Sequence, residues 1–279
     1  MAQQPAVKAK EFFPDVFSRH AESYRRRLED IMARGEARGR MRMLELAGLQ
    51  VGMRVLDLAC GPGNMSRLVA AKVAPGGEVV GVDLAPGMID LARRSGIADA
   101  TFEVMDMEQL AFAGATFDGA ICGHGLQFAP DLWRALSEVR RVLKRGGRLA
   151  ASVPASPLRD SVWGLLDEVI DRWLPSGPEV IDAGPTRQTV RDPDALRQAA
   201  LGAGFASATV EQVEEVVHWE SAEHLVSMFT GWWDCASRME NMTVDTREAL
   251  KNDAIAVLKR DHPGAISTTG RNLVLVANT

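Results

Sequence analysis

Two glycines that follow a short apolar run have the clearest chemical potential in this chain of 279 residues. The run Val55–Leu58 is typical of a strand that is covered on both faces. Gly61 and Gly63 then allow the backbone to turn tightly against a ligand, and the amides of a helix that begins after Gly63 would face a negative group. The spacing predicts a strand, turn and helix that bind an anionic part of a small molecule.

Two aspartates end the next apolar runs. Asp83 comes 22 positions after Gly61, and Asp106 follows the run 100–105. In an open parallel sheet, the carboxyl ends of the strands border the ligand crevice. We therefore expect Asp83 to accept hydrogen bonds from two ribose hydroxyls and Asp106 to accept one from an adenine amino group. The alternative for Asp83 is a helix cap.

Apolar and small residues beside these acids are the candidate walls of the same site. Leu84 directly follows Asp83, and Met88 and Met107 could enclose an adenine ring between polarisable side chains, although they are equally compatible with core packing. The fourth run, 117–128, contains Gly123 and His124, which we expect beside the reacting group.

The glycine spacing separates two cofactors. A dinucleotide fingerprint needs G-x-G-x-x-G, but the third position counted from Gly61 is Ser66. The carboxylate of S-adenosylmethionine is a smaller anion than a pyrophosphate, so that a shorter glycine turn is sufficient. The sequence thus favours S-adenosylmethionine over NAD.

With these four elements in order, residues 51–153 resemble the class I S-adenosylmethionine-dependent methyltransferases, most closely the ubiquinone/menaquinone-type small-molecule branch. The resemblance implies that Asp57, Gly61 and Gly63 hold the methionine part of the cofactor, and that Asp83 and Asp106 hold ribose and adenine. It also implies an α/β, Rossmann-like fold with a seven-stranded, mostly parallel sheet, helices on both faces and a reversed final strand.

Periodicity extends this organisation to the rest of the chain. Residues from about 15 to 49 have apolar side chains at helical intervals, and in related enzymes such a segment covers the cofactor, which makes Tyr24 a candidate cofactor contact or else a core residue. We predict four segments: an N-terminal helical segment over the active site (1–49), a cofactor-binding core (50–153), a helical cap (154–204), and the C-terminal part of the core sheet with helices (205–279).

Composition excludes several classes of protein. A net charge of −5 provides no general basic field for nucleic acid, and acids interleave the arginines of residues 19–42, so we expect a solvated helix face there. The three cysteines form no C-x-x-C pair, which argues against a disulfide framework or a zinc site and favours the cytoplasm. No leader and no membrane span is expected. Aromatic and methionine side chains of the cap and late helices predict an apolar acceptor pocket or, alternatively, a homo-oligomer interface.

A sulfonium methyl group is already electrophilic, so the enzyme has to align the acceptor and exclude water, without a metal. His124 is the best placed general base, with His20 second, although His124 could equally be a polar wall. We predict a methyltransferase that acts on oxygen or carbon of a hydrophobic, aromatic or polyketide-like small molecule. The alternatives are a cyclase that retains the cofactor as a scaffold, a binding module, and an RNA methyltransferase.

Overall fold

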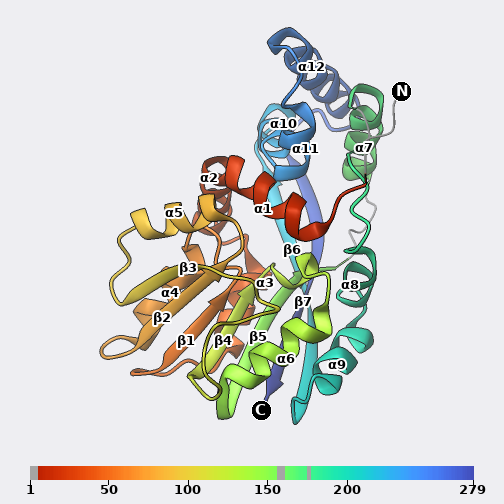
Figure 1. The fold of residues 1–279 in the computed structure, drawn as a ribbon. Helices are drawn as coiled ribbons and strands as arrows, with labels where there is room; N and C mark the ends of the chain where they lie inside the picture. The colour runs from red at the N-terminus through yellow and green to blue at the C-terminus, as the bar shows by residue number, and fades with distance from the viewer. Residues whose placement is uncertain (1–5, 156–160, 175–176) are drawn as a thin grey trace.

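The computed structural model describes residues 6–155, 161–174 and 177–279, so residues 1–5 of the predicted N-terminal segment and 156–160 and 175–176 of the predicted cap lie outside it. A seven-stranded sheet has the order β3-β2-β1-β4-β5-β7-β6 (Figure 1). β7 is antiparallel to both of its neighbours, and the pairs among the first five strands are parallel. The predicted fold class is confirmed. The strands are β1 (Arg54–Leu58), β2 (Glu78–Asp83), β3 (Ala100–Val104), β4 (Phe117–Gly123), β5 (Leu143–Pro154), β6 (Ser207–Trp219) and β7 (Ile266–Asn278).

Helices cover both faces of the sheet, which is why the central strands are apolar on both sides. Val55, Leu56 and Leu58 of β1 are completely buried. Asp131 caps one flanking helix by accepting a hydrogen bond from the amide of Arg134 at 2.9 Å. Helices that pack against the strands include α3 (Arg38–Leu46), α4 (Asn64–Val73), α5 (Pro86–Arg94), α6 (Leu132–Val142) and α9 (Pro193–Gly202).

The predicted N-terminal helical segment consists of three helices, α1 (Ala9–Arg19), α2 (Ala21–Ala33) and α3 (Arg38–Leu46). α1 crosses the carboxyl end of the sheet and packs against α5 (Figure 1). At the crossing, the Gly87 amide donates to Ser18 Oγ at 3.1 Å, and a Cβ at Gly87 would lie 2.6 Å from the Ser18 carbonyl oxygen. Glycine at position 87 therefore lets α1 approach the cofactor-binding half of the sheet.

An upper helical layer lies over the same end of the sheet and is made of the helices within residues 161–173 and 222–261 (Figure 1). Its helices come from both sides of the predicted boundary at residue 204, because α7 packs against α12, whereas α9 of the predicted cap packs against α6 and β6. The cap is thus assembled from two stretches of chain. The remaining helices are α7 (Ser161–Trp173), α8 (Gly184–Thr189), α10 (Ala222–Thr230), α11 (Trp233–Met239), α12 (Val244–Asp261) and the short 3-10 helix η1 (Leu126–Phe128).

One arginine departs from the predicted solvated face of the N-terminal segment. Arg27 is only 9% exposed, its guanidinium lies 3.5 Å from the centre of the Trp232 ring, and Nη1 donates to the Met228 carbonyl at 2.7 Å. Burial lowers the pKa of Arg27 to about 9. A cation–π contact and a backbone acceptor offset the cost of this burial, so Arg27 joins α2 to the upper helical layer.

Candidate functional site

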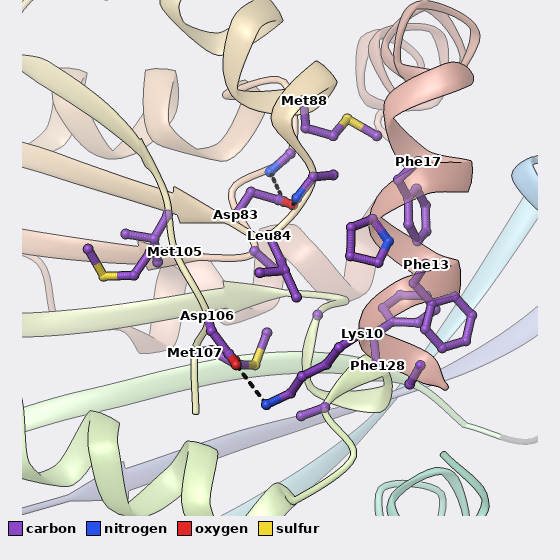
Figure 2. Close-up of a pocket in the computed structure, with 18 of the residues that line it drawn as sticks. Lys10, Phe13, Phe17, Asp83, Leu84, Met88, Met105, Asp106, Met107 and Phe128 are labelled. Carbon is purple, nitrogen blue, oxygen red and sulfur yellow. Dashed lines mark hydrogen bonds and ion pairs between the residues drawn. The ribbon is translucent and has the colours of Figure 1, made fainter. Parts of the chain in front are cut away.

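A pocket of about 790 Å³, counted with its open mouth, lies between α1 and the carboxyl ends of β1 to β4. In Figure 2, Phe13 and Phe17 of α1 face Asp83, Leu84 and Met88 across it. The sequence-predicted residues on its wall are Tyr24, Gly61, Asp83, Leu84, Met88, Asp106, Met107, Gly123 and His124.

Asp83 joins two loops at the edge of this pocket. Its Oδ2 accepts a hydrogen bond from the Gly61 amide and its Oδ1 accepts one from the Ala85 amide, both at 2.9 Å. Burial raises the pKa of the carboxyl group, while the two amide donors lower it. Each carboxylate oxygen has a second lone pair, so Asp83 fixes the glycine turn and can still accept hydrogen bonds from a ligand.

Asp57 and Gly63 lie away from the pocket wall. Asp57 is 1% exposed, and the Ser66 hydroxyl donates to its Oδ2 at 2.6 Å. Burial raises the pKa of Asp57 to about 7. Gly63 has φ of +87°, and a Cβ there would lie 3.2 Å from the Ile97 side chain. Asp57 binds the first turn of α4 through Ser66, and Gly63 is the residue of the glycine turn at which α4 begins.

Lys10 is a pocket residue that the sequence analysis did not identify. Its Nζ lies 2.6 Å from Asp106 Oδ2 (Figure 2). The same Nζ lies 2.5 Å from Glu108 Oε2. Glu108 is 5% exposed and also accepts the Asp131 amide at 2.8 Å. Asp106 accepts the Glu108 amide through Oδ1 at 2.9 Å. No sequence pattern pointed to Lys10 as a pocket residue, because its two carboxylate partners lie almost a hundred positions away in the chain.

His124 directly follows β4 and has a left-handed conformation with φ of +65°. Its amide donates to the Ser152 carbonyl at 2.8 Å, which holds the residue between β4 and β5. The imidazole Nε2 is buried and has no hydrogen-bond partner among the described residues. Burial and the nearby Arg40 charge lower the pKa of His124 well below its ordinary value, and a hydrogen bond with the Asn272 side chain raises it. The imidazole is therefore neutral at pH 7.

Tyr24 lines the glycine end of the pocket, and Arg40, which is not among the lining residues, lies directly behind Tyr24 and Gly123. Arg40 Nη2 lies 3.3 Å from the Tyr24 hydroxyl, and a Cβ at Gly123 would lie 3.7 Å from Arg40 Nε. The Tyr24 ring lies 3.9 Å from a Cβ placed on Gly61. Within the described part of the chain, Arg40 forms no ion pair with a carboxylate. The sequence analysis missed Arg40 because it stands in a run of charged helical residues.

Aromatic rings from distant parts of the chain cover one side of the pocket. The ring centres of Phe13 and Phe17 lie 4.9 and 5.2 Å from that of Phe128, and Phe13 lies 5.7 Å from Trp233. The predicted apolar surface of the cap contributes little here: the pocket is lined by Phe13, Phe17 and Phe128, whereas Trp163 of α7 packs against another ring. The apolar wall thus comes mainly from α1 and η1.

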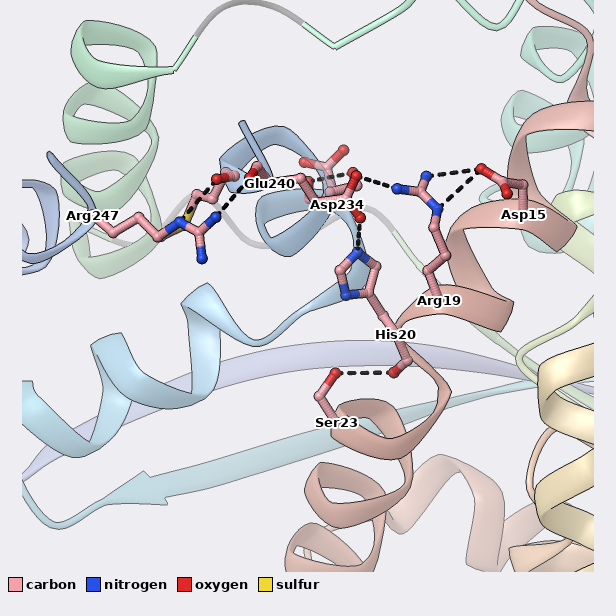
Figure 3. Close-up of polar contacts among 9 residues, drawn as sticks. Asp15, Arg19, His20, Ser23, Asp234, Glu240 and Arg247 are labelled. Carbon is pink, nitrogen blue, oxygen red and sulfur yellow. Dashed lines mark hydrogen bonds and ion pairs between the residues drawn. The ribbon is translucent and has the colours of Figure 1, made fainter. Parts of the chain in front are cut away.

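His20, the second candidate base, lies outside the pocket and beside Glu240. Its Nε2 lies 2.7 Å from Glu240 Oε1, and Arg19 pairs with the same carboxylate (Figure 3). Arg247 Nη2 donates to the Glu240 carbonyl at 2.6 Å. His20 is not among the residues that line the pocket. These contacts fasten the end of α1 to the upper helical layer.

Two structural features concern metal binding and cysteine reactivity. Among the residues that the structure describes, no group of three or more His, Cys, Asp or Glu side chains could hold a metal ion. Cys60, Cys122 and Cys235 are buried and unpaired, and burial raises the pKa of each thiol. A raised thiol pKa disfavours the reactive thiolate.

The donor set of the pocket fits S-adenosylmethionine. Asp83 and Asp106 provide carboxylates at the ends of adjacent strands, and Met88 and Met107 provide polarisable apolar walls. Behind the wall, next to Tyr24 and Gly123, Arg40 provides a positive charge. Ribose hydroxyls, an adenine ring and an amino-acid carboxylate are the corresponding ligand groups.

Comparison with known proteins gives the same assignment. The family model described as a methyltransferase domain matches residues 55–147. A demethylmenaquinone methyltransferase of Symbiobacterium thermophilum is 35% identical over 164 residues, which are 55% of this chain and 65% of the relative. The corresponding enzyme of Thermus thermophilus is 34% identical over 61% of this chain and 82% of its own length. Aklanonic acid methyltransferase DauC of a Streptomyces species is 36% identical over 40% of this chain and 53% of its own.

Solved structures share the fold at lower identity. A Haemonchus contortus phosphoethanolamine N-methyltransferase 2 in complex with S-adenosyl-L-methionine is 18% identical, with a TM-score of 0.52 over 86% of this chain and 52% of its own. The [4+2]-cyclase SpnF is 17% identical, with a TM-score of 0.55 over 99% of this chain and 98% of its own.

The sequence relatives and the matched domain decide the family, since the enzyme from Thermus is more than 30% identical over most of its length. The chain belongs to the class I S-adenosylmethionine-dependent methyltransferases, in the branch of the demethylmenaquinone methyltransferases.

Proposed function

We propose that this protein transfers a methyl group from S-adenosylmethionine to an oxygen or carbon atom of a hydrophobic small molecule. One observation carries the proposal: a single pocket brings together two strand-end carboxylates, Asp83 and Asp106, an orphaned imidazole nitrogen of His124 and the aromatic rings of α1 and η1. This combination provides a polar cofactor site next to an apolar acceptor wall.

The pocket residues divide among the parts of the cofactor. Asp83 binds the ribose hydroxyls. Asp106 accepts the adenine amino group with its remaining lone pairs, and Leu84, Met88 and Met107 enclose the ring. Gly61, Gly123 and Tyr24 border the amino-acid end, and Arg40, directly behind Tyr24 and Gly123, is the cation that attracts the carboxylate. Asp57 acts from beneath the turn.

The bound cofactor supplies an electrophilic methyl group on a sulfonium. The protein then has to place the acceptor atom in line with the sulfur–carbon bond and to exclude water. Phe13, Phe17 and Phe128 give an apolar cover to this space. His124 at the end of β4 accepts the proton that the acceptor loses, because its imidazole is neutral and Nε2 has no other partner among the described residues.

The acceptor class follows from the apolar wall and from the relatives. Flat aromatic molecules pack well against Phe13, Phe17 and Phe128, whose ring planes lie at steep angles to one another. The relatives named above methylate, by their names, demethylmenaquinone and aklanonic acid. We therefore favour a quinone-like or polyketide-like acceptor.

Methyl transfer from labelled S-adenosylmethionine to a panel of hydroxynaphthoates, demethylmenaquinone analogues and aromatic polyketide acids tests this function. The expected result is label in one acceptor class together with an equal amount of S-adenosylhomocysteine. Tight cofactor binding without turnover on any acceptor would favour the cyclase alternative, in which the cofactor is a scaffold.

The charges of the N-terminal helices disfavour an RNA acceptor. Arg25 pairs with Glu22 and Glu29, and Arg42 pairs with Glu45 and Glu211. Paired arginines are poor phosphate ligands because binding would first have to break these pairs. Fluorescence anisotropy with a labelled single-stranded RNA should show no salt-sensitive binding.

Two further properties are part of the proposal. The buried, unpaired cysteines suit the reducing cytoplasm. Exposed apolar side chains such as Trp133 and Val244, which are 59% and 72% exposed, are candidates for contacts between copies in a homo-oligomer. Cell fractionation tests the first property, and sedimentation equilibrium of the wild type and Trp133→Glu tests the second.

A further inference from the structure

The loop that follows β4 holds His124 by both of its backbone polar groups. The His124 amide donates to the Ser152 carbonyl of β5 at 2.8 Å, and the His124 carbonyl accepts a hydrogen bond from Gln127 Nε2, also at 2.8 Å. Gln127 belongs to η1, and the next residue, Phe128, lines the pocket. A side chain of η1 therefore ties the candidate base to the short helix that carries part of the apolar wall.

This hydrogen bond acts on a residue with an unfavourable backbone conformation. Among the described residues, four other than glycine have a positive φ, and two of them, Ala59 and His124, line the pocket. The left-handed region is costly for a residue with a side chain, and such residues persist only where the surrounding structure holds them. The Gln127 amide is thus part of what keeps His124 at φ of +65°.

Close packing fixes the path of the chain after His124. A Cβ on Gly125 would collide with the Ala59 Cβ and would lie 2.8 Å from Cys122 Sγ. The Gly125 carbonyl accepts the Phe128 amide at 3.0 Å, which closes the turn into η1. Because the loop is fixed on this side, the conformation of His124 itself is what the Gln127 hydrogen bond controls.

The other end of the Gln127 amide is unpaired. A carbonyl oxygen can only accept, so the NH₂ group of Gln127 faces His124. The atom without a hydrogen-bond partner among the described residues is then the acceptor Oε1, which is buried. A buried acceptor without a partner lowers stability, and an apolar side chain of similar length would avoid that cost. Such a residue is typical of a site where function, more than stability, sets the side chain.

We propose that Gln127 is a positioning residue for methyl transfer: its amide holds the left-handed backbone of His124 and thereby keeps Nε2 directed at the acceptor site. This inference rests on the proposed role of His124 as the proton acceptor. The buried Nε2 has no hydrogen-bond partner within the described part of the chain, so no contact at this atom fixes its place before the acceptor binds. The backbone sets that place, and Gln127 acts on the reaction through His124.

Ligand-free crystal structures of the wild type and of Gln127→Met test the positioning directly. Methionine is close to glutamine in length but cannot donate a hydrogen bond. We expect His124 to leave the left-handed region in Gln127→Met, or its Nε2 to move by more than about 0.5 Å, which is the tolerance of a productive site. A wild-type φ together with an unmoved Nε2 would overturn the proposal.

Kinetics with the acceptor found for the proposed function test the consequence. Gln127→Met should lower kcat by about tenfold or more, a part of what a general base contributes. The affinity for S-adenosylmethionine and the KM of the acceptor should stay the same, because Gln127 does not line the pocket. A kcat of wild-type size in Gln127→Met would contradict the role.

A second substitution restores the donor under control of pH. The activity of Gln127→Glu relative to the wild type should rise as the pH falls from 8 to 6, since only a protonated carboxyl group can donate to the His124 carbonyl. The relative activity of Gln127→Met should not depend on pH. The same pH dependence for both variants would speak against a hydrogen bond that positions His124.

Ser137 of α6 provides the matched control for stability. Its hydroxyl is also buried and unpaired among the described residues, and it lies outside the pocket. Gln127→Met and Ser137→Ala should both keep at least the wild-type urea midpoint of unfolding, because each removes a buried polar atom without a partner. Only Gln127→Met should lower kcat. A reduced midpoint in Gln127→Met, or an equal loss of kcat in both variants, would indicate a merely structural role and reject the proposal.

The ligand-free structures need no acceptor, so their outcome is separate from that of the proposed function. A displaced His124 in Gln127→Met would support the positioning role even if no acceptor were methylated. Methylation by the wild type together with an unmoved His124 in Gln127→Met would support the proposed function and reject this inference.

Discussion

The Lys10 ammonium of α1 lies 2.6 Å from the Asp106 carboxylate of the loop after β3, across the mouth of the cofactor pocket. The pair links the N-terminal helix to the sequence-predicted adenine ligand. At the other end of α1, His20 and Arg19 hold Glu240 (Figure 3). α1 is therefore fastened at both ends over the pocket.

Removal of the Lys10 contact should loosen α1 without unfolding the protein. The Lys10 side chain is 38% exposed, and ion pairs of this kind contribute about 0–1 kcal/mol to stability. We expect Lys10→Met to raise the dissociation rate of S-adenosylmethionine severalfold and to speed hydrogen exchange in residues 9–19. Stopped-flow displacement and exchange mass spectrometry measure both. The exposed neighbour Lys8→Met is the control, and identical rates for the two variants would contradict the fastening role.

Asp83 should be the strongest single determinant of ribose binding. We expect Asp83→Asn to weaken S-adenosylmethionine binding about 10- to 100-fold, since a hydrogen bond to a charged group contributes about 1.5–3 kcal/mol. Asparagine keeps the shape of the side chain and can still accept one of the two backbone amides, so the fold should persist. Calorimetry gives the affinity, and Asp90→Asn on the exposed face of α5 should leave it unchanged. Wild-type affinity of Asp83→Asn would reject the assignment.

The aspartates at the strand ends were predictable because each follows a local apolar run, and the parallel topology brings such ends together. Lys10 and Arg40 were not predictable. They stand in charged helical segments whose pattern indicates solvent. Only the packing of α1 over the sheet end brings Lys10 to the pocket, and only the packing of α3 against the strands brings Arg40 next to Gly123. Asn272 and Glu215 are 57 positions apart, and no local pattern reports a contact that depends on the pairing of β6 with β7.

Arg40 should act on the amino-acid end of the cofactor and not on its nucleoside. We expect Arg40→Met to weaken binding of S-adenosylhomocysteine about 10- to 100-fold, through the loss of a charge-assisted contact. Binding of 5′-methylthioadenosine, which lacks the amino-acid end, should change less than twofold. Arg38→Met, exposed at the start of α3, is the matched control. An equal loss for both ligands would place Arg40 elsewhere.

Asp57 should make the stability of the ligand-free protein depend on pH. Burial raises its folded pKa to about 7, above the usual unfolded value, so its contribution is fully present below about pH 4 and is lost as the pH rises through 7. Asp57→Asn should therefore gain stability relative to the wild type, by about 2 to 4 kcal/mol between pH 4 and pH 8. Urea unfolding of both proteins at several pH values measures this difference. A difference that is constant with pH would contradict an ionisation at Asp57.

The arrangement of the cap shows a second limit of sequence-based prediction. The sequence predicts helices within residues 154–204 and part of the core sheet within residues 205–279, but the packing partners of elements such as α9 and β7 depend on tertiary structure. α9 packs beside the sheet, whereas α7 meets α12 some eighty residues further along the chain. Arg27 gives a similar example, because the nearby acids indicated solvent while Trp232 covers its guanidinium.

Calorimetric titration of the full chain with S-adenosylmethionine and, separately, with NAD is the most direct test of the cofactor site on which every other claim depends. The pocket predicts micromolar, one-to-one binding of S-adenosylmethionine and no binding of NAD. Binding of NAD alone, or no heat with S-adenosylmethionine in the presence and absence of the candidate acceptors, would contradict the account.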